Sequence, residues 1–264
     1  MNRPVRYEWA RLTTLTSTWL LAAVTIAVTA LASWGYTFTV TEFQSTEMAV
    51  TPQEALVAVI NKASFVPLAA GIFGALAMGG DYRHGTIRAT LAITPVRSRA
   101  IAAKAVVAGG FALTVMACST AVSWIVACTS LPVELISRAS YGDLIVLHCG
   151  LLLQTVCWTL IGIAITIMFR SQTVAMVSLV AIPYMLEPMV RTGGMLTSSP
   201  WLTHMAKYLP FAAGTSMSNI SGDDGAFLAD ASQRLTPATA ILVFGLFTAA
   251  LYVAAVTRFR SQGI

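Results

Sequence analysis

Charged side chains are scarce in this chain. Only 10% of its 264 residues are Asp, Glu, Lys or Arg, whereas 56% are hydrophobic. A soluble globular domain carries about 25% charged residues, so this composition excludes an ordinary soluble domain. The mean hydropathy of +0.74 points the same way. The shortage of charge therefore places the chain among integral membrane proteins before any single residue is considered.

Cysteine is also sparse, and no two cysteines form a CxxC pair. The four cysteines lie in or beside apolar stretches: Cys118, Cys128, Cys149 and Cys157. Cysteines in this setting are typically small apolar residues, so we expect neither a disulfide framework nor a zinc site. The three histidines lie in different segments, so no metal site is expected from them either.

The sequence also lacks the motifs of the common nucleotide-binding and hydrolytic sites. There is no GxxxxGK[ST] phosphate loop, no GxGxxG motif, no HExxH and no G-x-S-x-G. We therefore expect that the chain is not an enzyme and binds no cofactor. If ATP drives its activity, ATP and Mg must be bound by a separate ATPase subunit.

What the chain does contain is long apolar runs. Six of them come near the roughly 20 residues needed to cross the hydrocarbon core. The predicted spans are Thr18–Thr37, Ala58–Met78, Ala102–Cys128, Leu144–Phe169, Val174–Val190 and Ala238–Thr257. The expected fold is an all-α integral membrane protein with a single transmembrane domain over residues 1–264.

The basic residues predict the orientation of these spans. If the N-terminus lies inside, 11 of the 16 Lys and Arg residues fall on the inner side: Arg3, Arg6, Arg11, Arg83, Arg88, Arg97, Arg99, Lys104, Arg170, Arg258 and Arg260. Such an excess marks the cytoplasmic side, so both termini are expected in the cytoplasm of a plasma-membrane protein. Because the positive charge lies at span ends, the net charge of +5 indicates a lipid surface rather than nucleic acid.

Two stretches are neither spans nor short loops. Residues 1–17 predict a helix lying in the membrane surface, or else a simple polar lead-in. Its apolar face would hold Val5, Trp9, Leu12 and Leu15, with Arg3, Glu8 and Arg11 facing elsewhere. The outer loop of residues 192–237 contains a Pro-bounded, partly apolar piece, Pro200–Phe211, which predicts a re-entrant segment.

Residues 80–100 form a basic segment between the second and third spans. A short helix is expected within Asp81–Thr94, because Gly79 and Gly80 provide a flexible joint and Pro95 stops a helix. A face of Thr86, Ile87, Thr90 and Leu91, with arginines beside it, suits a groove in a protein partner. The alternative is a positively charged inner loop without a partner.

Small residues on the second span predict close helix packing. Gly71, Ala75 and Gly79 recur every four residues, and small residues let helices approach closely in lipid. We expect this face and the fifth span, which Pro183 weakens, to form the contact between two copies of the chain or line a pathway. Packing within one chain is the alternative.

The walls of that pathway would be apolar. The candidate residues are Phe65, Phe73, Met176, Tyr184 and Met185, with Glu187 at the outer mouth. They suit a hydrophobic or amphipathic cargo, and they suit a lipid-facing surface equally well. Glu187 would either pair with Arg191 one turn on, the simpler option, or meet the cargo.

Ionisable side chains deep in the spans are almost absent. Carriers driven by protons or sodium usually place carboxylates or histidines at mid-membrane. Of the candidates here, Asp143 and Glu187 lie near the predicted outer ends of spans and His148 about a turn and a half deeper, and all three suit interface anchoring or local pairing. This shortage favours an external energy source. An ATP-independent secondary transporter or channel remains the alternative.

Three groups of residues resemble one known family. They are Tyr7–Leu12 followed by Ser17-Thr18-Trp19, Asp81–Arg88 with Leu91, Thr94-Pro95, Arg97 and Lys104, and Leu209-Pro210-Phe211 before the last span. With the order of six spans, these resemble bacterial ABC transporter permeases of the drug and antibiotic exporter type, which have a type V exporter-like transmembrane domain. The family pattern has Glu where this chain has Asp81.

The resemblance implies a permease subunit that pairs with a second permease chain and with two soluble ATPase subunits. The loop after the second span would be a coupling helix that docks on the ATPase. By this resemblance, the residues expected to couple to the ATPase are Asp81, Tyr82, Arg83, His84, Thr86, Ile87, Arg88 and Leu91. Cargo such as a drug, antibiotic, peptide or lipid would be exported, and the stretch before the sixth span would dip back into the membrane.

Overall fold

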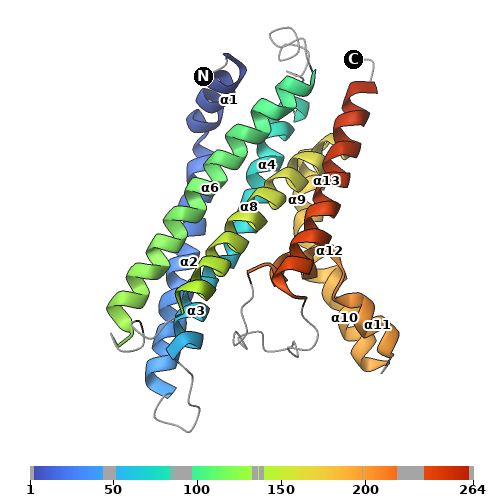
Figure 1. Cartoon of the computed structure of the whole chain (residues 1–264). Coiled ribbons are helices and arrows are strands. Elements are labelled where there is room, and N and C mark those ends of the chain that lie inside the picture. The colour runs from blue at the N-terminus through green and yellow to red at the C-terminus, as the bar shows by residue number, and fades with distance from the viewer. Residues whose placement is uncertain are drawn as a thin grey trace.

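The structure is a computed structural model of the whole chain (Figure 1). It describes residues 3–43, 52–83, 85, 97–132, 136, 140–197, 199–218 and 235–261. Every regular element within these ranges is a helix, so the all-α prediction is confirmed for this part of the chain.

The described helices follow one another in a simple order. They are α1 (Arg3–Thr14), α2 (Thr16–Phe43), α3 (Pro52–Asn61), the 3₁₀ turn η1 (Lys62–Phe65), α4 (Val66–Arg83), α6 (Arg97–Ser130), α8 (Tyr141–Phe169), α9 (Gln172–Ala181), the π-helical segment η2 (Ile182–Leu186), α10 (Glu187–Leu196), α11 (Pro200–Ala206), α12 (Pro210–Ser216) and α13 (Pro237–Ser261).

Six of the described stretches are long and apolar enough to cross a membrane. They are Thr16–Val40, Ala55–Arg83, Ser98–Ser130, Tyr141–Phe169, Gln172–Leu196 and Pro237–Ser261. Each overlaps one of the six predicted spans, so this prediction is confirmed. The structural spans are longer because their helices continue into polar flanking residues.

The helices are arranged with both chain ends at one end of the molecule (Figure 1). α1 lies at that end, whereas α3, α10 and α11 lie at the opposite end. An even number of crossings requires the termini to share a side. The side of the membrane on which they lie stays a prediction from the positive charge.

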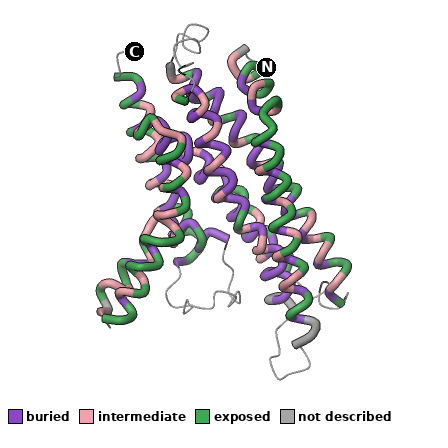
Figure 2. Tube along the Cα trace, turned by 180° about the vertical axis from the view of Figure 1, so that it is seen from behind, coloured by how far each residue is buried: buried purple, intermediate pink, exposed green. Residues whose placement is uncertain are grey.

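The centre of the bundle is formed by α4 and α8. In the most apolar windows of spans two and four, 67% and 72% of the residues are buried, against 17% for span five and 22% for span six. Figure 2 shows this contrast as a buried middle flanked by exposed outer helices. The outer spans therefore leave most of their apolar surface for lipid or another protein.

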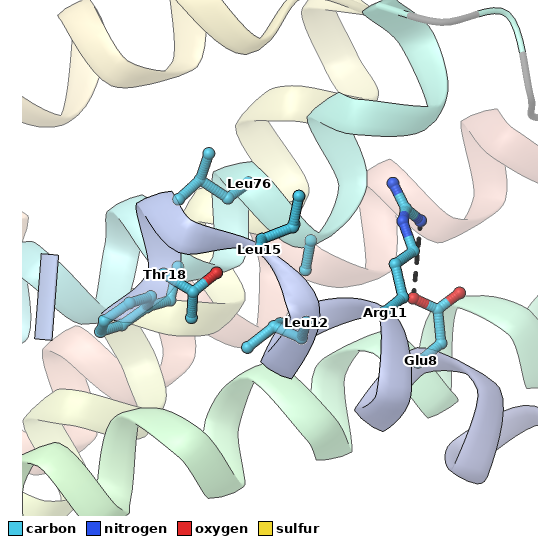
Figure 3. A pocket seen from close by; sticks show the side chains of 8 residues that line it. Glu8, Arg11, Leu12, Leu15, Thr18 and Leu76 are labelled. Atoms are coloured by element: carbon cyan, nitrogen blue, oxygen red, sulfur yellow. Dashed lines mark ion pairs between the residues drawn. The ribbon is translucent and has the colours of Figure 1, made fainter. Parts of the chain in front are cut away.

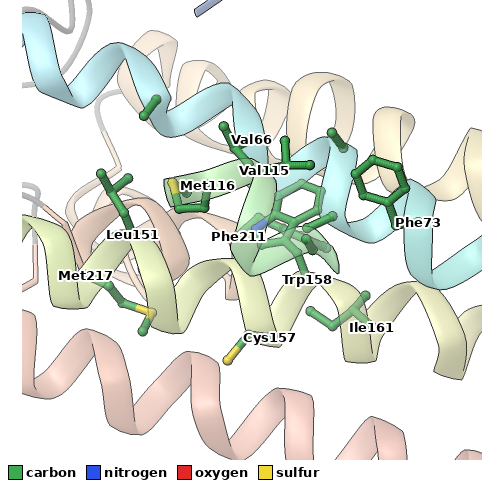
Figure 4. Close-up of a cluster of buried hydrophobic side chains, with 14 of the residues drawn as sticks. Val66, Phe73, Val115, Met116, Leu151, Cys157, Trp158, Ile161, Phe211 and Met217 are labelled. Atoms are coloured by element: carbon green, nitrogen blue, oxygen red, sulfur yellow. The ribbon is translucent and has the colours of Figure 1, made fainter. Parts of the chain in front are cut away.

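Glycine allows α4 and α8 to touch through their backbones. A Cβ on Gly162 of α8 would overlap the carbonyl oxygen of Gly71, and one on Gly74 of α4 would overlap that of Thr159. Only glycine fits such an approach. α4 and α8 also contribute to a buried apolar cluster that includes Phe73, Trp158 and Phe211 (Figure 4).

Spans two and five are both interrupted. Span two contains the 3₁₀ turn η1, and Pro67 lies just after it in the first turn of α4, where a proline costs no hydrogen bond. Span five contains η2, which includes Pro183. The predicted weakening of the helix at Pro183 thus takes the form of a π-helical segment.

The stretch between spans five and six contains two short helices, α11 and α12. Phe211 of α12 packs on Trp158, with their ring centroids 4.8 Å apart, and on Phe244 of α13 at 6.0 Å. Trp158 lies near the middle of α8, so the chain outside the six spans reaches well into the bundle.

Candidate functional site

Four charged side chains form one buried cluster at the end of the molecule that holds the termini. The Lys104 Nζ lies 2.7 Å from the Glu8 Oε1 and 2.9 Å from the Asp81 Oδ2. The Arg11 Nη1 lies 2.6 Å from the Asp81 Oδ1 and 3.6 Å from a Glu8 oxygen. We call these four residues the charge cluster. Two acids and two bases balance its formal charge.

The charge cluster joins three helices. Glu8 and Arg11 come from one face of α1, Asp81 from the last turn of α4, and Lys104 from the second turn of α6. Glu8, Asp81 and Lys104 are all buried, and Lys104 also donates to the Ala77 carbonyl at 3.2 Å. Burying these charges is tolerated because each has an opposite charge within hydrogen-bonding distance.

A small cavity lies beside the cluster, lined by Glu8 and Arg11 together with apolar residues such as Leu12 and Leu76 (Figure 3). The prediction that Glu8 and Arg11 face away from the apolar face of α1 is therefore wrong for Glu8. Glu8 and Leu12 point into the protein, whereas Trp9 and Leu15 are exposed. A buried lysine on α6 needs a carboxylate, and Glu8 supplies it.

The structure places only part of the predicted coupling segment. Asp81, Tyr82 and Arg83 end α4, and Gly85 takes a positive φ of 64°. The remaining predicted contacts, His84, Thr86, Ile87, Arg88 and Leu91, lie outside the described residues. The Asp81 carboxylate turns into the charge cluster, so its direct role is to fix the base of the segment.

The small-residue face of span two lies inside the chain. Gly71, Ala75 and Gly79 are all buried. A Cβ on Gly71 would lie 3.1 Å from both Leu179 and Trp158, and one on Gly79 would lie 2.6 Å from Gln172. The prediction that these three residues contact a second copy is therefore wrong, and the alternative of packing within one chain is correct.

The predicted pathway residues are not brought together. Phe73 is 1% exposed and packs edge-on against Phe111, so it belongs to the core of the bundle. Met176 packs against the same core. Phe65 on η1 and Tyr184 and Met185 on η2 are about half exposed on the outside of the bundle.

Glu187 is buried and binds α12. Its two carboxylate oxygens accept hydrogen bonds from the backbone amides of Phe211, at 2.9 Å, and Ala212, at 2.7 Å. Amides in the first turn of a helix have no partner within the helix, so a carboxylate there is stabilised. These two amides, and not Arg191, are the hydrogen-bond partners of Glu187, so the predicted ion pair with Arg191 is not formed, although the positive charge of Arg191 still acts on the carboxylate.

Glu187 also borders a large apolar groove. The groove has a volume of about 430 Å³ and is partly open to its surroundings. Its lining comes from α8, span five, the start of α12, and α13: Ile161, Ile165, Met168, Phe169, Ser178, Ile182, Leu186, Glu187, Val190, Leu209, Pro210, Phe211, Phe247 and Leu251. Sequence reasoning found Glu187 but missed the groove, since its residues come from four separate segments.

Comparison with known protein families identifies the class of this chain. The family model for ABC-2 family transporter proteins matches residues 5–264, nearly the whole chain. No curated protein and no solved structure matches it. With its six spans, the chain is a multi-pass membrane protein. The chain belongs to the ABC-2 transporter family and is the transmembrane subunit of an ABC transporter rather than its ATPase.

Proposed function

We propose that the chain is the permease subunit of an ATP-driven exporter. It would move a hydrophobic or amphipathic compound, such as a drug, antibiotic, peptide or lipid, across the plasma membrane. The observation that carries the proposal is the convergence of Glu8, Asp81 and Lys104 in the charge cluster. These three residues come from the segments that resemble the exporter permeases.

The charge cluster supports a role for residues 80–100 in contact with the ATPase. Asp81 lies at the start of this segment and Lys104 follows its end, so their ion pair ties the two ends together. α1 is attached to the same pair through Arg11 and Glu8. A push on the segment would therefore act on α1, α4 and α6 at once, as coupling to an ATPase requires.

Two further parts of the proposal concern the membrane. With both termini in the cytoplasm, α1 would lie in the inner membrane surface and would be held there by its exposed Trp9 and Leu15. α12 would be re-entrant from the outer side, since Phe211 reaches the middle of α8 and Glu187 binds two of its amides.

A second permease chain would contact span five. Only 17% of the most apolar window of this span is buried within the chain, and its exposed side chains include Tyr184, Met185 and Met189. The buried face of span two cannot take part. Pairing through span five supports a homodimer or a heterodimer with a related permease equally.

Transport in vesicles tests the proposal. The chain would be reconstituted with its soluble ATPase subunit, oriented with the ATPase outside, and offered a panel of amphipathic dyes. We expect uptake that needs hydrolysable ATP and stops when the phosphate-loop Lys of the ATPase is replaced. Uptake driven by an ion gradient without ATP would contradict the proposal and favour a secondary transporter or channel.

A further inference from the structure

The apolar groove combines a shape and a chemistry that small-molecule sites share. A volume of about 430 Å³ lies within the common range of ligand pockets, which are mostly apolar with a few polar groups. Among the described lining residues only Ser178 and Glu187 are polar. α8, span five and α13 all contribute to its walls.

Glu187 gives this groove a defined polarity. Its side chain is buried, and each oxygen accepts one backbone amide. A carboxylate has about four acceptor positions, so one on each oxygen is left for another donor. An anionic group in the groove would be repelled, whereas a protonated amine would gain a charge-assisted hydrogen bond.

The backbone is distorted where Glu187 meets the groove. The Glu187 amide donates to the Ile182 carbonyl, five residues back, and so closes the wide turn of η2. Such π-helical turns are frequent at functional sites, because they shift the residues that follow to a different face of the helix. Ile182, Leu186 and Glu187 all line the groove.

We propose that the groove binds a cationic amphiphile whose protonated amine bonds to Glu187 and whose apolar body lies along α8, span five and α13. The inference that this amphiphile is the transported cargo rests on the proposed function. Binding itself requires neither ATP nor an ATPase subunit. Two alternative occupants are a neutral lipid chain and a second copy of this chain. Neither would need the Glu187 carboxylate in order to bind.

Binding is tested with three photoreactive probes that share one alkyl chain and differ in the head: an amine, an alcohol and a carboxylate. The full chain would be held in discs of uncharged, zwitterionic phospholipid, and labelled residues would be identified by mass spectrometry. We expect the amine to label groove residues about tenfold more efficiently than the alcohol, as one hydrogen bond to a charged group allows. The carboxylate should label them least.

Two substitutions on neighbouring residues separate binding from folding. Val190 lines the groove and Met189 does not, and both are exposed on α10. Val190→Trp should fill the groove and lower amine labelling about tenfold, while Met189→Trp should leave it unchanged. Glu187→Gln should abolish the preference for the amine over the alcohol.

Three results would overturn the inference. Equal labelling by all three probes would make the groove a lipid contact. Equal loss in the Val190 and Met189 variants would show that labelling occurs elsewhere on span five. No labelling, combined with cross-links between chains across the groove, would make it a contact between copies. In each case ATP-driven transport could still occur, so the proposed function would stand.

Discussion

The Lys104 ammonium lies 2.7 Å from the Glu8 carboxylate, although 96 residues separate them in the sequence. Lys104 is 2% exposed, and its two acidic partners come from α1 and α4. Through its two ion pairs, Lys104 of α6 holds α1, which lies outside the six spans, and the end of α4. α4 and α6 are the two helices that flank residues 84–96. This relationship links the end of the chain to the segment proposed to meet the ATPase.

Removing the buried lysine should destabilise the fold. Lys104→Met leaves two carboxylates facing a single arginine, and breaking a buried pair from one side costs about 3–5 kcal/mol. The double variant Lys104→Met/Glu8→Gln keeps the Arg11–Asp81 pair balanced and should recover at least half of the loss. Unfolding in detergent, followed by circular dichroism, measures both. Arg6→Met on the exposed side of α1 is the control and should change little.

Adding one methyl group to the α4–α8 contact should be severe. Gly162→Ala would place a Cβ against the Gly71 carbonyl and force the central helices apart. We expect a loss of about 3 kcal/mol or more, since backbone cannot yield as a flexible side chain does. Gly109→Ala on α6 has no atom within 4 Å of the new Cβ and should be neutral or slightly stabilising. Equal stability of the two variants would contradict the close approach.

The orientation of the termini is open to labelling. A cysteine at Ser98 should react with a membrane-impermeant thiol reagent only from the cytoplasmic side, and one at Asp223 only from outside. The four native cysteines must first be replaced. Asp223 lies outside the described residues, so its label also places the stretch between α12 and α13. Labelling of Ser98 in intact cells would reverse the topology.

Contacts between two permease chains should involve span five and not the small-residue face. Tyr184 is 50% exposed, whereas Ala75 is completely buried. Oxidation of membranes that carry a single cysteine at Tyr184 should therefore yield a covalent dimer, and a cysteine at Ala75 should not. A dimer formed only through Ala75, or only through spans one or six, would place the interface elsewhere.

The spans were predictable because their length and apolar composition follow directly from the thickness of the bilayer. What each face of a span contacts could not be predicted in the same way. A face that packs on another helix and a face that meets lipid or a second chain are both apolar in a membrane, so Gly71, Ala75 and Phe73 gave no sign that they were internal. Likewise, Glu8 was expected away from the apolar face of its helix and Asp81 in the segment that contacts the ATPase, because sequence does not show that Lys104 is buried between them.

Ile87 and Leu91 provide the most direct test of the central claim, which is that residues 80–100 transmit ATP hydrolysis to transport. Both residues lie outside the described part of the chain. In vesicles that contain the chain and its ATPase subunit, ATP hydrolysis and dye uptake would be measured together for the native chain and for Ile87→Asp/Leu91→Asp. We expect that uptake per ATP falls about tenfold or more, or that the ATPase no longer assembles with the permease. Unchanged assembly with unchanged uptake per ATP would contradict it.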